Sequence, residues 1–213
     1  MFQGTGYATA AIIPGMFWGH NAEIKPRPYD PEKARALLAE AGYADGFETE
    51  IWAIPVIRPY MPNGRRAAEL IQSDWAKLGI KASIVTYEWA EYLKRSRAGE
   101  AQVGMFGGSW DYPDPSQIPN SYFSCNLDNK PSPSNIGQWC NDEYNAIMRS
   151  AAAAKTQQER AELYKKLQVV FNREVPAVIL GSAKSLTAIS KKVHGYEPVA
   201  VGTTPLAGVW VDE

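Results

Sequence analysis

Apolar residues recur at helical spacing in several long stretches of the chain, and they alternate with polar residues in shorter stretches between them. The first predicted helix follows Asp30, a good N-cap, and ends before Gly42, while a capping box over residues 156–159 opens the last one. The predicted helices cover residues 31–41, 64–78, 89–98, 142–153 and 157–173. The predicted strands cover residues 47–54, 81–87 and 102–106, with shorter ones at 176–180, 186–189 and 209–211.

Strand, helix, strand, helix and strand follow one another between residues 47 and 106, an order typical of a layered α/β fold. Residues 113–141 are expected to form a long loop, which in a compact domain is usually functional or stapled. Residues 1–28 show no clean period and are interpreted as an extended lead-in with room for one strand. The turn-rich end, from about Lys192, is expected to belong to another packing unit.

Composition and charge narrow the function classes. The chain has 213 residues, enough for one large domain with a real core. Its net charge of −1 gives no electrostatic footprint for nucleic acid or an anionic membrane surface, and no apolar run approaches the length of a membrane span. Seven Trp and eleven Tyr suit a binding surface, although any single ring could equally belong to the core.

Cys125 and Cys140 both fall in the predicted loop 113–141. Two lone thiols are one interpretation, but two cysteines in one polar loop favour a disulfide bridge and an oxidising compartment. Residues 1–19 lack a basic start and are broken by glycine and proline, so they do not predict a signal peptide. We therefore expect a mature form or a fragment of an exported protein.

The stretch MFGGSWDYPD, residues 105–114, is the first candidate site. An apolar run breaks at two glycines and delivers Ser109, Trp110, Asp111 and Tyr112, which indicates a strand that opens into a loop. Ligands of open α/β sheets bind beyond such strand ends. An acid between two large aromatic residues there predicts a half-buried recognition site in which Asp111 receives a cation.

Arg58 supplies the opposite charge. It lies in a loop stiffened by Pro55, Pro59 and Pro62, shortly after another predicted strand. If both strand ends lie on one sheet edge, Arg58 and Asp111 face the same cleft. A zwitterion with charges one or two residues apart, at roughly 3.3–3.6 Å per residue, would then fit between them. The alternative is that both are ordinary surface charges.

The sequence favours a binding protein over an enzyme. His20 and His194 are the only histidines, they lie far apart in turn-like settings, and they predict neither a metal cluster nor a histidine base. The stretch around Ser109 lacks the final glycine of a nucleophile elbow, and no glycine-rich phosphate loop is present.

Long ungapped segments carry a resemblance to a known family. From about Pro14 to Val211 the chain resembles the C-terminal part of the periplasmic solute-binding proteins of peptide-importing ABC transporters, extracellular solute-binding family 5. The segments that carry the resemblance are YDPEKARALLAEAG (29–42), RPYMPNGRRAAELIQSDWAKLGI (58–80), VTYEWAEYLKR (85–95), FSC…QWC (123–140), ELYKKLQVVFNREVPAVI (162–179) and KKVHGY (191–196).

The resemblance implies an α/β lobe of the type II periplasmic-binding-protein kind, a mixed sheet flanked by helices. It implies that Arg58 holds the ligand carboxylate and that Asp111 holds the ligand amine, with Ser109, Trp110 and Tyr112 beside them. It also implies a disulfide between the two cysteines. No cofactor is expected, and the small number of histidines argues against a metal. In the family motif the tryptophan stands three positions before the acid, whereas here Trp110 directly precedes Asp111.

The resemblance further implies a division of the chain and a set of partners. Residues 1–28 would be a lead-in from a missing lobe or hinge, residues 29–191 the C-terminal ligand-binding lobe, and residues 192–213 a segment returning toward the missing N-terminal lobe. The partners would be a small peptide and the permease subunits of an ABC transporter. The location would be the periplasm, or the cell exterior in association with the membrane, and the contact with the membrane would be only peripheral.

Other functions stay open at this point. The ligand could be an oligosaccharide stacked on Trp89, Trp110 and Tyr112, a haem or a metal complex, since relatives in the superfamily bind such solutes. An exported hydrolase and a purely structural interaction domain are the rivals from other classes.

Overall fold

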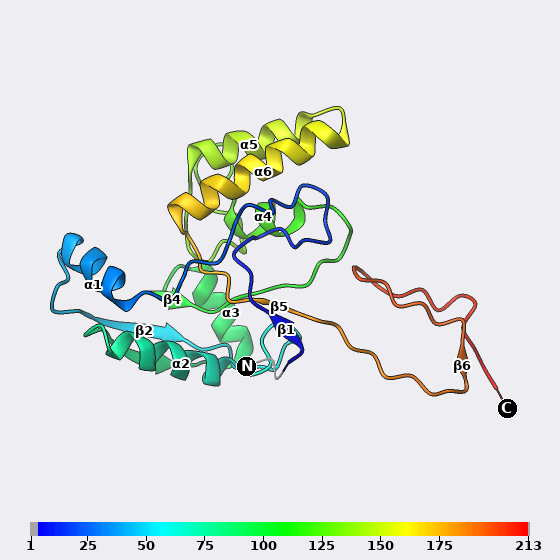
Figure 1. The fold of residues 1–213 in the computed structure, drawn as a ribbon, viewed down its shortest axis with the longest axis horizontal. Helices are drawn as coiled ribbons and strands as arrows, with labels where there is room; N and C mark the ends of the chain where they lie inside the picture. Colours follow the sequence, from blue (N-terminus) through cyan, green and yellow to red (C-terminus); the bar gives the residue numbers. More distant parts are fainter. Residues whose placement is uncertain (1–3, 213) are drawn as a thin grey trace.

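The computed structural model describes residues 4–212, whose helices lie on and beside a small parallel sheet (Figure 1). Along the chain the elements are β1 Gly6–Tyr7, α1 Pro31–Glu40, β2 Glu48–Trp52, α2 Gly64–Ala76, β3 Lys81–Val85, α3 Trp89–Arg97, β4 Val103–Gly104, α4 Gln117–Phe123, α5 Asp142–Ala153, α6 Gln157–Glu174, β5 Ser182–Ala183, β6 Val193–His194 and β7 Trp210–Val211. The predicted β-α-β-α-β order from residue 47 to residue 106 is confirmed.

The central sheet has the strand order β3-β2-β4, and both pairings are parallel. Ile51 and Trp52 at the end of β2 are fully buried, and α2 packs beside β2 and β3 with its small residues Ala67 and Ala68 inward. Parallel strands joined by helices bring their carboxyl ends to one edge. In this sheet Trp52 of β2 is paired with Gly104 of β4 at that edge.

A second core lies between α5 and α6. The Thr156 capping box starts α6, and Tyr144 and Leu167 are among the fully buried side chains where the two helices meet. The lead-in contributes Ile13 and Phe17 to this core, so part of residues 1–28 packs into it. The apolar faces that the sequence predicted for both helices are confirmed.

The predicted loop 113–141 is corrected in one respect, because α4 lies inside it. Helical periodicity is hard to detect in seven residues that contain Pro119, and this proline is buried. The disulfide predicted for Cys125 and Cys140 is confirmed, with a Cα–Cα distance of 5.6 Å and a sequence separation of 15.

The strands predicted at 176–180 and 186–189 are wrong. The structure has the short strand β5 between them, paired with β1, which lies almost the length of the chain away. Val178 and Leu186 are each more than 70% exposed and have no strand partner among residues 4–212. The predicted strand 209–211 is confirmed as β7, which pairs with β6.

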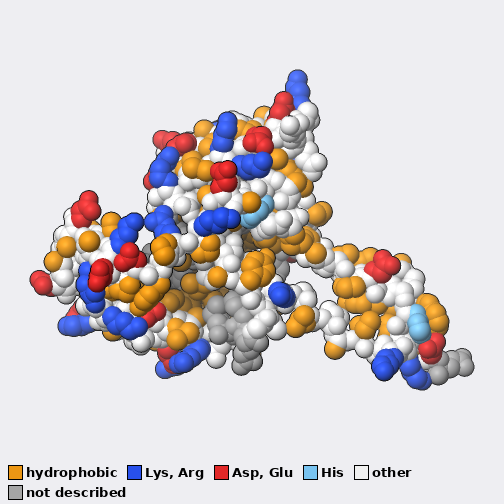
Figure 2. All heavy atoms as spheres, viewed as in Figure 1, with side chains coloured by type: hydrophobic (Ala, Val, Ile, Leu, Met, Phe, Trp, Pro, Cys, Tyr) orange, Lys and Arg blue, Asp and Glu red, His pale blue; other side chains and the backbone are white. Residues whose placement is uncertain are grey.

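The segment after β5 extends away from the two cores and carries the β6–β7 pair (Figure 1). Apolar side chains are spread over its surface (Figure 2), and they include Leu186, Ile189, Leu206, Trp210 and Val211, all exposed. Its middle returns to the body, where the Gly202 N–H donates to the Trp110 carbonyl at 3.1 Å. Within residues 4–212, no helix is long and apolar enough to cross a membrane.

Candidate functional site

Arg58 and Asp111 follow neighbouring strand ends. Arg58 comes after β2, Asp111 comes after β4, and these strands are paired at Trp52 and Gly104. The Met105 N–H also donates to the Trp52 carbonyl at 3.2 Å, so the chain runs side by side just beyond the sheet. The predicted condition, that both strands end on one sheet edge, is therefore confirmed.

The Arg58 guanidinium is held by stacking. Its Cζ lies 4.7 Å from the centroid of the Trp89 ring, and its Nε is buried with no hydrogen-bond partner. A two-way backbone pairing with Met61 closes the proline-stiffened turn around it. Among residues 4–212 the Arg58 side chain has no ion-pair partner, so its charge is not neutralised within the described chain.

Tyr92 fixes the two strand ends to each other. It is fully buried, its ring stacks on Trp89 at 5.8 Å, and its hydroxyl lies 2.6 Å from the Met105 carbonyl and 3.1 Å from the Trp52 carbonyl. Burial raises the pKa of the Tyr92 hydroxyl far above its ordinary value, so this donor stays protonated. Arg58, Trp89 and Tyr92 thus form one stack that reaches from the sheet edge to the surface.

Tyr60 brings the loops of Arg58 and Asp111 into contact, and Tyr122 of α4 contacts the same glycine, Gly107. The Tyr60 ring packs on Gly107 so closely that a Cβ at that position would overlap it, and the Tyr122 hydroxyl donates to the Gly107 carbonyl at 3.3 Å. Burial raises the pKa of Tyr60, and the nearby Arg58 charge opposes this rise. Burial also raises the pKa of Tyr122, and the Asp111 carboxylate raises it further. Each candidate anchor therefore lies near enough to one of the two tyrosines to affect its pKa.

The Asp111 carboxylate is exposed, which corrects the prediction of a half-buried acid. The preceding Trp110 turns inward and packs on Phe17, with ring centroids 4.2 Å apart, and this turn leaves the following side chain on the surface. The Asp111 Oδ2 accepts a hydrogen bond of 2.7 Å from the Gln117 side chain. Within the described part of the chain, no cation is paired with Asp111.

The other predicted site residues lie around Asp111. Ser109 is exposed and its carbonyl lies 3.5 Å from the Gln117 amide nitrogen. The Tyr112 side chain is 48% exposed. Trp110 packs on the α5–α6 core and Trp89 carries Arg58, so these rings are not arranged as one common stacking surface. The ligand-binding roles of Ser109, Trp110 and Tyr112 stay predictions.

Asp114 anchors the far end of this loop to α6. Its carboxylate forms an ion pair with Arg160 at 2.9 Å and accepts from the Ser116 N–H at 2.9 Å. Desolvation alone would raise the pKa of Asp114, but the hydrogen bonds from Ser116 and the Arg160 charge outweigh it and lower the pKa. Arg160 in turn lies over the Trp18 ring and donates to the Tyr164 hydroxyl.

The sequence and the fold of this chain are both similar to those of known proteins. The family described as "Bacterial extracellular solute-binding proteins, family 5 Middle" matches residues 1–130. The chain belongs to this family. Membership confirms the recognition made from the sequence segments, the type II periplasmic-binding-protein kind of fold and the predicted periplasmic location.

Several family-5 relatives are similar over nearly all of the chain. The dipeptide-binding protein of Escherichia coli (strain K12) is 44% identical over 196 residues, which are 92% of this chain and 36% of that protein. Heme-binding protein A of Haemophilus influenzae is 42% identical over 213 residues, 100% of this chain and 38% of that protein. The solved dipeptide-binding protein of Pseudoalteromonas sp. SM9913, in complex with Met-Leu, superposes with a TM-score of 0.85 at 31% identity, over 99% of this chain and 41% of that one. The chain therefore spans well under half the length of these relatives.

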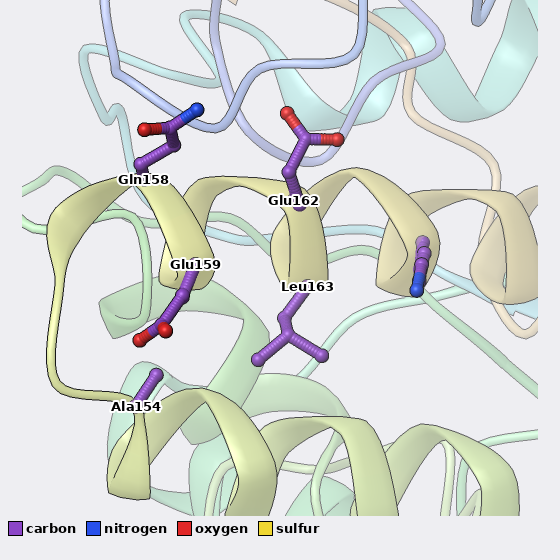
Figure 3. A pocket seen from close by; sticks show the side chains of 6 residues that line it. Ala154, Gln158, Glu159, Glu162 and Leu163 are labelled. Carbon is purple, nitrogen blue, oxygen red and sulfur yellow. The ribbon is translucent and has the colours of Figure 1, made fainter.

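One hollow in the described part of this family-5 chain lies away from Arg58 and Asp111. It is a shallow depression of ≈ 550 Å³ along the first half of α6, where Glu159 and Leu163 point toward the end of α5 (Figure 3). Its lining is Ala154, Gln158, Glu159, Glu162, Leu163 and Lys166. No group of three or more metal-ligating side chains occurs among residues 4–212. At the sheet edge, Arg58 is half-buried and Asp111 is exposed, so both candidate anchors are at least partly open to solvent.

Sequence reasoning missed three residues that shape this surface, namely Tyr60, Gln117 and Tyr122. Tyr60 and Tyr122 carried no signal beyond the general abundance of tyrosine. Gln117 stood in a stretch interpreted as loop, and glutamine has no turn or capping preference that would single it out. Its role depends on α4, which places its side chain under the Asp111 loop.

Proposed function

We propose that this chain is the ligand-binding lobe of a periplasmic solute-binding protein that binds di- or short oligopeptides and delivers them to an ABC permease. One observation carries the proposal. Arg58 and Asp111 present opposite charges beyond adjacent strand ends, and neither charge is neutralised by another described residue. A peptide zwitterion supplies the two missing counter-charges.

The chemistry of each end follows from its surroundings. The planar Arg58 guanidinium offers a fork of donors to a carboxylate, and its stacking on Trp89 limits the freedom that it would lose on binding. The Asp111 carboxylate offers acceptors to an ammonium group. Each charged ligand end gives up its hydration on binding, so both ends need a partner.

Names of the relatives support peptides as the ligand class, because two of the proteins compared above are dipeptide-binding proteins. Binding would proceed by closure of two lobes around the peptide, without a chemical step. In this proposal residues 29–191 form the C-terminal lobe, and residues 1–28 and 192–213 connect it to an N-terminal lobe. The exposed apolar side chains of the C-terminal segment would then pack on that lobe.

Isothermal titration calorimetry of the full-length protein with Met-Leu tests the proposal. Charge-assisted hydrogen bonds contribute about 1.5–3 kcal/mol each, so Arg58→Gln and Asp111→Asn should each weaken binding about 10- to 100-fold. Arg66→Gln and Asp128→Asn remove matched charges from exposed positions and should leave the Kd unchanged. Unchanged Kd values for both site variants would refute the proposal.

Heme is the second candidate ligand, because all 213 residues of this chain match part of heme-binding protein A. The two histidines are not at the sheet edge: the His20 ring contacts the Ile13 carbonyl, and the His194 ring stacks on Trp210. Titration with hemin, followed by its visible absorbance, distinguishes the candidates. Saturable hemin binding that is insensitive to Arg58→Gln, with no Met-Leu binding, would favour heme.

A further inference from the structure

The Gln117 side chain contacts the loop that carries Asp111 at four points. The Gln117 Oε1 accepts from the Asp111 N–H at 2.8 Å and from the Tyr112 N–H at 3.4 Å. The Gln117 Nε2 donates to the Asp111 carboxylate at 2.7 Å and lies 3.5 Å from the Ser109 carbonyl. Gln117 is buried at the first position of α4, so this bracket is fixed by the helix.

The partners determine how the Gln117 carboxamide is oriented. Both groups facing its oxygen are backbone donors, and both groups facing its nitrogen are acceptors. A carboxamide supplies two acceptor sites on its oxygen and two donors on its nitrogen without a net charge. Glutamate would repel Asp111, and methionine or leucine would satisfy neither side.

A comparison of Asp114 with Asp111 shows why it matters that Gln117 is uncharged. The Asp114 carboxylate is neutralised by Arg160, and it serves to fasten the loop. The Asp111 carboxylate, three positions earlier, is held by a neutral amide and has no ion-pair partner among residues 4–212. One of its oxygens is occupied by Gln117, which fixes the direction in which the other oxygen faces solvent.

We propose that Gln117 is a positioning residue for amine selectivity: it orients the Asp111 carboxylate without neutralising it, so that a ligand with a free α-amine is preferred over one whose amine is blocked. This inference rests on the proposed function. It adds a residue outside the charged pair and assigns to it the discrimination between free and acylated amino termini.

The test compares Met-Leu with N-acetyl-Met-Leu on the full-length protein. The wild-type protein should bind the free peptide at least tenfold more tightly, and Asp111→Asn should abolish this ratio. Gln117→Met should reduce the ratio about tenfold, and the double variant should behave as Asp111→Asn alone, because the two residues act through one contact. Gln168→Met is the matched control, since it removes another buried carboxamide, whose bonds go to Gly19, Asn21 and Tyr164.

The possible results distinguish the role of Gln117 from the proposed function. A Gln117→Met protein that weakens both peptides equally would show a purely structural role and overturn the inference, while the proposed function would stand. A wild-type protein that binds neither peptide would overturn both. If Gln117→Met does not fold, Gln117→Glu keeps the acceptor for the backbone donors and alters only the other half of the bracket. Its selectivity at pH 7 should fall below that of the wild type, because a second carboxylate beside Asp111 replaces the donor, and a ratio as high as that of the wild type would also overturn the inference.

Discussion

Removal of the Tyr92 hydroxyl tests directly how the two strand ends are held together at the sheet edge. Tyr92→Phe keeps the ring that stacks on Trp89 and removes only the hydroxyl, which lies between the Met105 and Trp52 carbonyls. A hydroxyl has one hydrogen, and the 2.6 Å contact to Met105 is the shorter of the two. The Trp52 carbonyl still accepts from the Met105 N–H after the change, so the principal loss is the partner of the Met105 carbonyl.

The expected loss of folding free energy follows from the one carbonyl that is left without a partner. Leaving one buried acceptor unpaired costs about 1–3 kcal/mol, and we expect about 2 kcal/mol for Tyr92→Phe. For a chain of this size, each kcal/mol lowers Tm by roughly 2–4 °C, so Tm should fall by roughly 4–8 °C. Thermal unfolding of the 213-residue chain, followed by circular dichroism, measures the shift.

Tyr43→Phe is the matched control, because the Tyr43 side chain is 51% exposed and should shift stability by less than about 0.5 kcal/mol. A Tyr92→Phe protein as stable as this control would refute the reasoning, since it would show that the hydroxyl does not hold the two strand ends together. In the full-length protein, the same variant should also weaken Met-Leu binding, because Arg58 and Asp111 follow those strand ends.

Three further predictions concern the loops around the site. Replacing Cys125 and Cys140 by serine should lower the free energy of unfolding by about 3 kcal/mol, the chain-entropy value for a loop of about 15 residues, and equal stability in urea would contradict this. Gly107→Ala places a Cβ on the Tyr60 ring and should destabilise the chain by about 1–3 kcal/mol, measured by thermal unfolding against wild type. Asp114, whose pKa is lowered, contributes stability that is complete above about pH 4 and is lost as the pH falls through its folded-state pKa. Acid titration of Asp114→Asn should therefore lack that part of the transition, and a curve parallel to that of the wild type would exclude the contribution.

Local pattern was sufficient for the elements whose stability comes from one amphipathic face. The helices α2, α3, α5 and α6 begin within one residue of their predicted starts, because caps and apolar spacing are encoded within each segment. The elements that were predicted wrongly or missed carry no such pattern within their own segment. β5 exists only because β1 pairs with it from far along the chain, and α4 is too short to show a period.

The same distinction explains the site. Arg58 and Asp111 could be selected from the sequence because loops after parallel strands meet at a sheet edge whatever their detailed shape. The direction of each side chain within those loops is set by distant residues instead. Phe17 draws Trp110 inward, which exposes the Asp111 carboxylate, and Gln117 then orients that carboxylate. A strand-end rule therefore selects the charged residues of such a site, while the residues that aim those charges emerge only when the packing between loops is known.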